Sequence, residues 1–167
     1  VKGNNTFTNC STLKRCEFSE NSNMTTMCQY MYHQCSSLES FYFPAGVTEI
    51  PKGEGQNYGF FYKCYALSEV TFGSNETMTT IGITAFRFCT ALEYITIPDS
   101  VTYVDTNAFR ESGLKTTPFS HNSKLSGIGE HVFYKCASLE TAFIPKNVTA
   151  FHNCTSNDGG LFDRCTS

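Results

Sequence analysis

The sequence is notable first for what it lacks. It has no tryptophan and only four methionines, and no apolar run approaches the eighteen residues of a membrane-spanning helix. It also lacks an excess of basic residues, because 12 Lys and Arg against 15 Asp and Glu give a net charge of -3 with both signs interspersed. A nucleic-acid-binding protein would carry a basic patch or stripe. These absences argue against nucleic acid as a partner and against a transmembrane segment.

What the chain does contain is a repeat. Its clearest copy, residues 85–98, reads Ala-Phe-x-x-Cys-x-x-Leu followed by the alternating segment Ile-x-Ile-Pro. Aligned copies place one anchor residue at successive spacings of 25, 29, 25, 23, 24 and 29 residues, at Cys10, Cys35, Cys64, Cys89, Ser112, Cys136 and Cys165. A period in the twenties indicates a solenoid in which each repeat forms one coil.

Two further features of the repeat predict how the coils fold. An aromatic residue stands three positions before every anchor, and we expect these rings to stack into one buried ladder: Phe7, Tyr32, Phe61, Phe86, Phe109, Phe133 and Phe162. After each anchor, apolar residues alternate with period two, which is typical of a short strand. This predicts one parallel sheet from segments near residues 14–18, 39–43, 68–72, 93–97, 115–119 and 140–144. A second apolar pair in each coil gives a second inward-facing segment.

The domain organisation follows from the repeat. No single coil can bury its apolar faces, so neighbouring coils must stack. We expect residues 1–167 to form a single, mainly β solenoid of six to seven coils, with turns and short helical or irregular segments between the strands. Two coils are longer than the others, which predicts Gly-rich loops inserted near residues 51–60 and 152–161.

The nine cysteines divide into two groups. Six occupy the anchor column, where burial as small apolar side chains explains them. The other three, Cys16, Cys28 and Cys154, lie outside the column, and we expect them to hold most of the disulfide chemistry. The odd total leaves at least one thiol free or paired between chains. No Cys-x-x-Cys occurs, which argues against a zinc or thioredoxin-like site.

The sequence also contains six Asn-x-Ser/Thr acceptor sites for N-glycosylation, at Asn4, Asn9, Asn23, Asn75, Asn147 and Asn153. Three of them, Asn23, Asn75 and Asn147, fall in the polar turn after a strand segment, where we expect a glycan to reach solvent. The excess of these sites favours an extracellular or cell-surface location. The chain starts at Val1 without a Met, as expected for a mature form or a fragment.

These motifs resemble the BspA-like leucine-rich repeat family. The pattern Ala-Phe-x-x-Cys-x-x-Leu-x-x-Ile-x-Ile-Pro-x-x-Val reads directly through residues 85–101, and the resemblance covers residues 7–165. It implies a solenoid with its Leu-x-x-Ile-x-Ile strands on the concave side, in surface proteins of anaerobic bacteria and protists used for adhesion and protein binding. It implies no shared catalytic residues. The chain departs from the pattern at Cys16, at Cys28 and at the contracted Ser112-Gly113-Leu114 repeat.

Candidate functional residues lie on the outward positions of the strands. His33, His121, His131 and His152 occupy unrelated repeat positions, so we expect no catalytic residues, no metal site and no cofactor. Exposed aromatics on a sheet are common anchors of interfaces, whereas isolated surface aromatics also simply favour strands. The candidates for ligand binding on the concave face are Tyr42, Tyr94, Thr96, Phe143 and Glu69.

Two functions remain open, and neither is enzymatic. The first is a structural, self-associating extracellular protein that stacks head to tail into a glycosylated filament. The alternative is an adhesin segment that binds a host or matrix protein through its concave face. The expected partners are accordingly a second copy of the chain, or a protein or glycan ligand.

Overall fold

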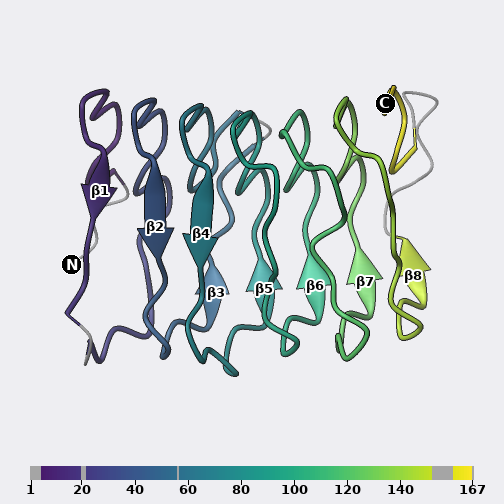
Figure 1. Ribbon diagram of the computed structural model, residues 1–167. Helices are drawn as coiled ribbons and strands as arrows, with labels where there is room; N and C mark the ends of the chain where they lie inside the picture. The colour runs from purple at the N-terminus through teal and green to yellow at the C-terminus, as the bar shows by residue number, and fades with distance from the viewer. Residues whose placement is uncertain (1–4, 20–21, 56, 152–159, 167) are drawn as a thin grey trace.

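The computed structural model describes residues 5–19, 22–55, 57–151 and 160–166. The chain forms a parallel β-solenoid whose coils stand side by side in a row, from the N-terminus at one end to the C-terminus at the other (Figure 1). Each coil runs along one side of the molecule, turns, and returns along the other. The described residues contain no helix. The predicted repeat solenoid is therefore confirmed.

The strands form two parallel sheets on opposite sides of the coils (Figure 1). The front sheet has the order β1-β2-β4, with β1 at Arg15–Cys16, β2 at Ser40–Tyr42 and β4 at Glu69–Thr71. The back sheet has the order β3-β5-β6-β7-β8, with β3 at Glu49–Ile50, β5 at Thr80–Ile81, β6 at Tyr103–Val104, β7 at Gly127–Ile128 and β8 at Ala150–Phe151. Equivalent residues of neighbouring coils pair, so Phe41 lies opposite Val70 and Ile81 opposite Val104.

The prediction of six paired strands in the front sheet is wrong for its second half. Residues 93–97 form no strand, and a single bridge, Thr116 to Thr141, joins the next two segments. Proline has no backbone N–H, so Pro118 cannot donate to a ladder. The Thr117 hydroxyl takes over the pairing there, since Phe143 N donates to Thr117 Oγ1 at 2.8 Å and this oxygen donates to Phe143 O at 2.8 Å. The longer regular sheet is the one built from the second apolar pair of each coil.

The aromatic ladder is confirmed. Its seven rings stack in sequence with centroids 5.1 to 5.8 Å apart and interplanar angles of 3 to 26°. Backbone hydrogen bonds join the same corner from coil to coil, because Phe61 N donates to Ala85 O at 2.8 Å and Lys63 N to Arg87 O at 3.0 Å. This corner therefore holds neighbouring coils together independently of the sheets.

The corner is a tight turn that requires a left-handed backbone. The residue before each anchor has a φ between 56 and 64°, at Asn9, Gln34, Lys63, Phe88, Glu111, Lys135 and Arg164. None of these is glycine, although the left-handed conformation costs an ordinary residue about 1–2 kcal/mol. The turn brings the anchor N–H back to the ladder residue, as where Cys64 N donates to Phe61 O at 3.0 Å.

One apolar core runs through the stack between the two sheets. The first long loop adds to it, because Phe60 at its end is fully buried, with its ring centroid 4.7 Å from that of Phe61. The second predicted loop, residues 152–161, lies almost entirely outside the described residues.

Candidate binding face

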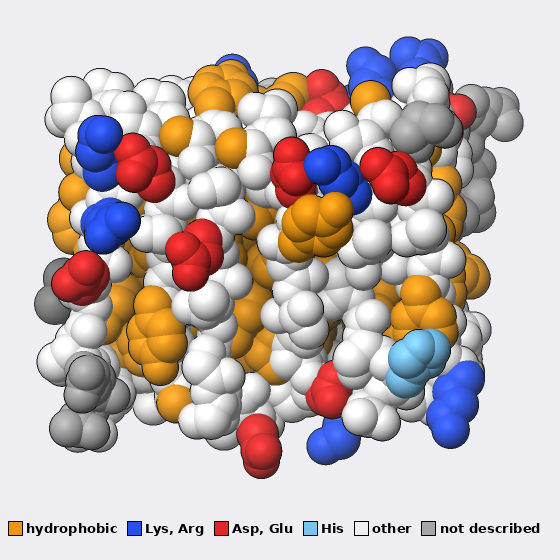
Figure 2. Space-filling model, viewed as in Figure 1, with side chains coloured by type: hydrophobic (Ala, Val, Ile, Leu, Met, Phe, Trp, Pro, Cys, Tyr) orange, Lys and Arg blue, Asp and Glu red, His pale blue; other side chains and the backbone are white. Residues whose placement is uncertain are grey.

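The predicted concave surface corresponds to the front face, which we define as the front sheet together with residues 93–97, 115–119 and 140–144. Figure 2 shows this face as a largely uncharged surface with apolar side chains visible between the coils and a few charged side chains, some of them in contact with one of opposite sign, as in the pairs Lys14–Glu39 and Lys115–Glu93. Tyr42 and Tyr94 are 41% and 59% exposed, and Glu69 and Thr96 are exposed as well. Phe143 differs, because it is half-buried and its ring lies 4.4 Å from that of His121.

The front sheet is open beside β4. On one side β4 is bonded to its neighbour, with Phe43 N donating to Thr71 O at 2.8 Å. On the other side lie residues 93–97, which are bonded to the coil after them, with Ile97 N donating to Pro118 O at 3.1 Å. Within the part of the chain that the structure describes, no backbone hydrogen bond crosses between β4 and residues 93–97.

The opening therefore has backbone donors and acceptors on both walls. Alternate residues of a strand direct their N–H and C=O groups to opposite sides. The backbone groups of Thr71 point to β2, so those of Val70 point into the opening. The backbone groups of Ile97 point to the following coil, so those of Tyr94 and Thr96 point into the opening from the other wall. The backbone groups of Val70, Tyr94 and Thr96 have no hydrogen-bond partner among the described residues.

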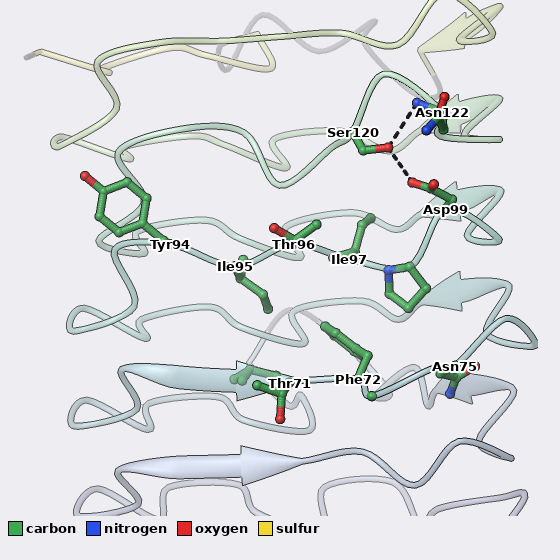
Figure 3. Close-up of a pocket in the computed structure, with 13 residues that line it drawn as sticks. Thr71, Phe72, Asn75, Tyr94, Ile95, Thr96, Ile97, Asp99, Ser120 and Asn122 are labelled. Atoms are coloured by element: carbon green, nitrogen blue, oxygen red, sulfur yellow. Dashed lines mark hydrogen bonds between the residues drawn. The ribbon is translucent and has the colours of Figure 1, made fainter.

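A hollow of about 660 Å³ occupies this opening (Figure 3). Its two long walls are residues 70–73 and 94–98, and Asp99, Ser120 and Asn122 close one end. The floor is apolar, since the side chains of Val70, Phe72 and Ile95 are buried yet keep 5 to 7% of their surface exposed. The hollow thus combines an apolar floor with polar backbone walls.

The end of the hollow is a fixed polar group. The Ser120 hydroxyl donates to the Asp99 carboxylate, and Asn122 N donates to Ser120 Oγ at 3.0 Å (Figure 3). Lys124 N also donates to Asp99 O, at 2.9 Å. These bonds hold the Asp99 carboxylate at the end of the floor.

Tyr94 stands on the rim beside an ion pair. Lys115 Nζ lies 2.7 Å from Glu93 Oε2 and 5.7 Å from the centre of the Tyr94 ring. The hydrogen bond to Glu93 raises the pKa of Lys115. The contact positions the exposed ring on the face while leaving most of it in solvent.

The structure divides the five predicted ligand-binding residues among three places. Tyr94 and Thr96 line the opening. Tyr42 and Glu69 line a smaller hollow of about 140 Å³ on the other side of β4. The Tyr42 ring lies across Gly73, whose φ is 54° and where an added Cβ would stand 2.5 Å from the tyrosine oxygen. Glycine suits this position, because a larger residue would have to displace the Tyr42 ring. Phe143 lines neither hollow.

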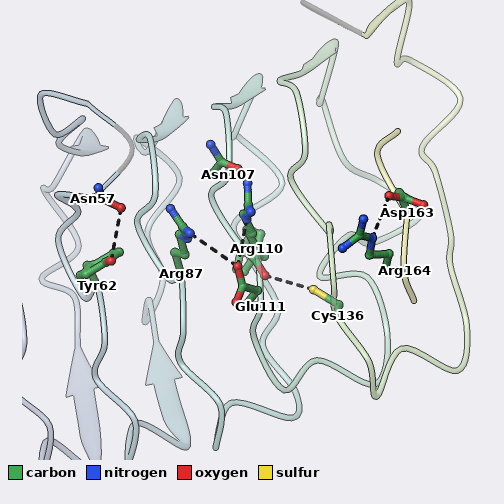
Figure 4. Close-up of polar contacts among 10 residues, drawn as sticks. Asn57, Tyr62, Arg87, Asn107, Arg110, Glu111, Cys136, Asp163 and Arg164 are labelled. Carbon is green, nitrogen blue, oxygen red and sulfur yellow. Dashed lines mark hydrogen bonds and ion pairs between the residues drawn. The ribbon is translucent and has the colours of Figure 1, made fainter. Parts of the chain in front are cut away.

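The sequence did not reveal a second surface feature at the aromatic corner (Figure 4). Basic side chains from successive coils lie over aromatic rings there, with 4.4 to 5.9 Å from charge to ring centre, at Lys63, Arg87, Arg110, Lys135 and Arg164. The rings belong to Tyr62, Phe88 and Tyr134. Glu111 accepts from two of these cations, at 3.0 and 3.5 Å. The signal was present, because all these residues occupy the two positions after the ladder aromatic.

Comparison with known proteins now assigns the repeat. A family model described as the BspA type leucine-rich repeat region matches the chain in six copies, over residues 2–54 and 55–161. The chain belongs to this family. Curated proteins show no match to it. A solved leucine-rich repeat protein from Bacteroides ovatus is 19% identical, with a TM-score of 0.49 over 95% of this chain and 49% of its own length. The chain thus spans about half the length of that protein.

Other site classes were also tested on this BspA-type solenoid. In the ranges that the structure describes, no three His, Cys, Asp or Glu side chains come together as a metal site, and no helix is long and apolar enough to cross a membrane. His121 is exposed, whereas His33 and His131 are buried at the corner, and His152 lies outside the described residues. Burial lowers the pKa of His33.

The glycosylation sites do not all reach solvent. Asn9, Asn23 and Asn147 are exposed, and Asn4 and Asn153 lie outside the described residues. The expectation for Asn75 is wrong, because its side chain is 4% exposed and structural. Its amide nitrogen donates to Val47 O at 2.8 Å and to Pro44 O at 3.3 Å, so both amide hydrogens are bonded to the neighbouring coil.

The anchor cysteines form a second ladder behind the aromatic one. Each described thiol after the first donates to the carbonyl of the ladder residue one coil earlier, at 3.0 to 3.3 Å, in Cys35, Cys64, Cys89, Cys136 and Cys165. Ser112 lies in the same column, 3.5 Å from Cys136 Sγ. Burial raises the pKa of Cys35 and of Cys136 to about 11. These thiols are therefore protonated core groups.

The cysteines outside the column have other surroundings. Cys16 Sγ accepts from the Tyr32 hydroxyl at 2.9 Å, and burial is the largest cause that raises the pKa of Tyr32. Cys16 and Cys28 are half-buried, and Cys154 lies outside the described residues. No disulfide joins two described cysteines. The pairing of these three residues stays a prediction.

Proposed function

We propose that this BspA-type repeat protein is a non-enzymatic, surface-exposed adhesin segment that binds a protein ligand through its front face. The observation that carries the proposal is the opening beside β4, where an apolar floor, unpaired backbone groups and the exposed Tyr94 ring lie together. Binding sites typically combine an apolar surface with a few fixed polar groups. Tyrosine is enriched among the residues that dominate binding energy.

Substitution of Tyr94 tests binding without disturbing the fold. More than half of its ring surface is in solvent, so its removal takes little from the core. Truncation of an interface anchor typically costs at least about 2 kcal/mol of binding energy, or more than tenfold in affinity. Tyr65 offers a matched control, because it is 44% exposed and lines a different hollow, together with Lys63 and Gln34.

The test is a binding screen of the immobilised protein against purified extracellular-matrix proteins and glycans, read by surface plasmon resonance. For a protein that binds, we expect Tyr94→Ala to lower affinity about tenfold or more, while Tyr65→Ala leaves it unchanged. Loss of binding in the Tyr65→Ala variant alone would overturn the assignment to the front face. So would a ligand that is indifferent to both substitutions.

End-to-end stacking of copies is a second candidate function, supported by the corner of the stack. Within the chain, each corner donates two backbone N–H groups to the next coil, as where Phe133 N donates to Leu161 O at 3.1 Å and Lys135 N to Asp163 O at 2.9 Å. The equivalent donors of the last described corner are Phe162 N and Arg164 N. The carbonyl groups of the first described corner would complement them in a second copy. Such a contact repeats without closing and produces a filament.

We rank stacking second because its support is limited to the backbone donors of one corner, whereas the opening beside β4 combines an apolar floor, backbone groups and an exposed ring. Sedimentation at increasing protein concentration tests the idea. Phe162→Glu should abolish any concentration-dependent assembly, while Tyr65→Glu should not. A protein that stays monomeric at every concentration would contradict stacking.

The proposed surface location and glycosylation rest on the acceptor sites. Of the described ones, Asn9, Asn23 and Asn147 present their side chains to solvent. Glycosylation of Asn75 would replace an amide hydrogen that is bonded to the neighbouring coil. We expect glycopeptide mass spectrometry of the native protein to find glycans on the exposed sites and none on Asn75. Unmodified peptides at all sites would remove this part of the proposal.

A further inference from the structure

We propose that the opening beside β4 binds an extended peptide segment of its ligand, which adds to the front sheet as a strand between β4 and residues 93–97. The inference deepens the proposed front-face binding and rests on it. It identifies the ligand by its chemistry: a stretch of extended polypeptide with apolar side chains at alternate positions.

The backbone of both walls carries the argument. Val70 directs an N–H and a C=O into the opening from one side, and Tyr94 and Thr96 direct theirs from the other. Tyr94 and Thr96 stand two positions apart, which is the spacing that a peptide strand complements, and Val70 offers one further pairing position on the opposite wall. Backbone groups of an open strand that pair with a peptide contribute binding free energy. A peptide strand would satisfy both walls at once.

The floor sets the side-chain preference. The side chains that reach the bottom of the hollow are apolar, at Val70, Phe72 and Ile95, whereas Thr71 and Thr96 on the rims are exposed and polar. Successive side chains of a strand point to opposite faces. A bound strand would therefore place apolar side chains on the floor and polar ones in solvent, which is the pattern of this chain's own repeats.

The fold permits the necessary widening. Two strand spacings require walls about 9.6 Å apart. The other sides of the same two coils remain joined, because Thr80 pairs with Tyr103 in the back sheet and the Phe61 and Phe86 rings stack at 5.4 Å at the corner. In the proposed complex these contacts would hold the two coils together while the front side widens. The hollow of about 660 Å³ lies within the usual range of ligand sites, about 300–1,000 Å³.

The probe is a synthetic peptide with the sequence of residues 92–97, capped at both ends and flanked by lysines for solubility. We expect it to bind and to slow amide hydrogen exchange at Val70, Tyr94 and Thr96. A peptide of the same composition in scrambled order, and one with N-methylated backbone nitrogens, should bind about tenfold more weakly, because each loses pairing or register. Equal binding of all three peptides would overturn the proposal.

Two variants of the full chain test the wall itself. Thr96→Pro removes an N–H that has no partner among the residues that the structure describes, and the extended residue before it suits a proline. Thr96→Ala changes the side chain and keeps the N–H. We expect Thr96→Pro to weaken peptide binding about tenfold and Thr96→Ala to leave it unchanged. If Thr96→Pro unfolds, the N-methylated peptide supplies the same comparison from the ligand side.

The results also separate this inference from the proposed function. If the peptide slows amide exchange at Arg15 and Cys16 and not at the residues of the opening, it adds to the outer edge of β1, and strand addition at the opening is wrong. If the peptide leaves the amides of the opening unprotected while a protein ligand still depends on Tyr94, front-face binding stands and strand addition fails. If the peptide binds in the opening but no protein ligand depends on Tyr94, the proposed function fails instead.

Discussion

Substitution of Asn75 by aspartate should destabilise the protein strongly, although the two side chains have the same shape. The amide nitrogen of Asn75 donates to Val47 O and Pro44 O in the neighbouring coil, and its oxygen accepts from Thr77 N and Met78 N, both at 2.9 Å. Asp keeps the acceptor and loses both donors. The Val47 carbonyl would lose its partner, the Pro44 carbonyl would keep only its bond from Val47 N at 3.1 Å, and both would face a buried carboxylate.

The magnitude follows from the two lost bonds. A buried hydrogen-bonding group left without its partner costs about 1–3 kcal/mol. For the shorter bond to Val47 and the longer one to Pro44 together, we expect Asn75→Asp to lower the free energy of unfolding by about 2–4 kcal/mol. Asn147 is the matched control, because it occupies the same repeat position, is exposed, and donates one bond to Ser123 O at 2.9 Å. Asn147→Asp should cost about 0.5–1 kcal/mol.

Urea denaturation followed by circular dichroism measures both variants, with equal denaturant slopes required for the comparison. A difference of less than about 0.5 kcal/mol between the two aspartate variants would refute the reasoning. Asn75→Ala should be at least as damaging as Asn75→Asp, since it loses the acceptor as well. An Asn75 side chain that carries a glycan in the folded protein would also refute it.

Three further predictions follow from the corner and the face. Phe86→Ala removes a ring stacked on both sides and should lower the free energy of unfolding by about 3–5 kcal/mol, whereas Tyr94→Ala should change that free energy by less than about 0.5 kcal/mol. A larger loss for Tyr94→Ala than for Phe86→Ala in denaturation would mean that the buried and exposed faces are misassigned. Burial raises the pKa of Cys35 and Cys136 from 9.0 to about 11, so unfolding between these pH values releases protons, and the free energy of unfolding should fall as pH rises from 9 to 11. A free energy of unfolding that does not change over this pH range would contradict the burial of these thiols. Gln34→Gly should raise the free energy of unfolding by up to about 1 kcal/mol, because Gln34 has a φ of 59° and glycine adopts this left-handed backbone without steric strain. A lower free energy of unfolding would show that the Gln34 side chain stabilises the fold by more than its backbone conformation costs.

The sequence predicted the repeat and the ladder because both depend on period and apolar character alone. A ring every 23 to 29 residues can stack only if the coils align, so Phe61, Phe86 and Phe109 fall in register. The exposure of Tyr42 and Tyr94 followed from the alternation of side chains along an extended segment. These are local rules that hold in every coil.

The break in the front sheet could not be read from the sequence. The segment 93–97 has a clear strand pattern, yet it lacks a ladder to β4, because pairing depends on how two neighbouring coils meet. Turn length does not explain the break, since long and short turns alternate across paired and unpaired coils alike. Nothing in the structure gives its cause.

Polar side chains were also misjudged where they replace backbone bonds. Asn75 resembles any turn asparagine in sequence, but the neighbouring coil presents two carbonyl groups to it, and that arrangement exists only after stacking. The charged residues at the corner occupy fixed repeat positions, but stacking decides which partner each one meets. Arg87 meets Glu111, and Arg110 meets the Tyr134 ring, in the next coil.

Amide hydrogen exchange of the free protein, resolved by NMR, tests the open sheet most directly. Residues adjacent in sequence serve as internal references. The account predicts fast exchange at Val70, Tyr94 and Thr96 and slow exchange at Phe43 and Ile97, whose N–H groups are bonded to neighbouring coils. Equal protection of Thr96 and Ile97 would show that the front sheet is continuous between β4 and residues 93–97, and the binding site proposed there would not exist.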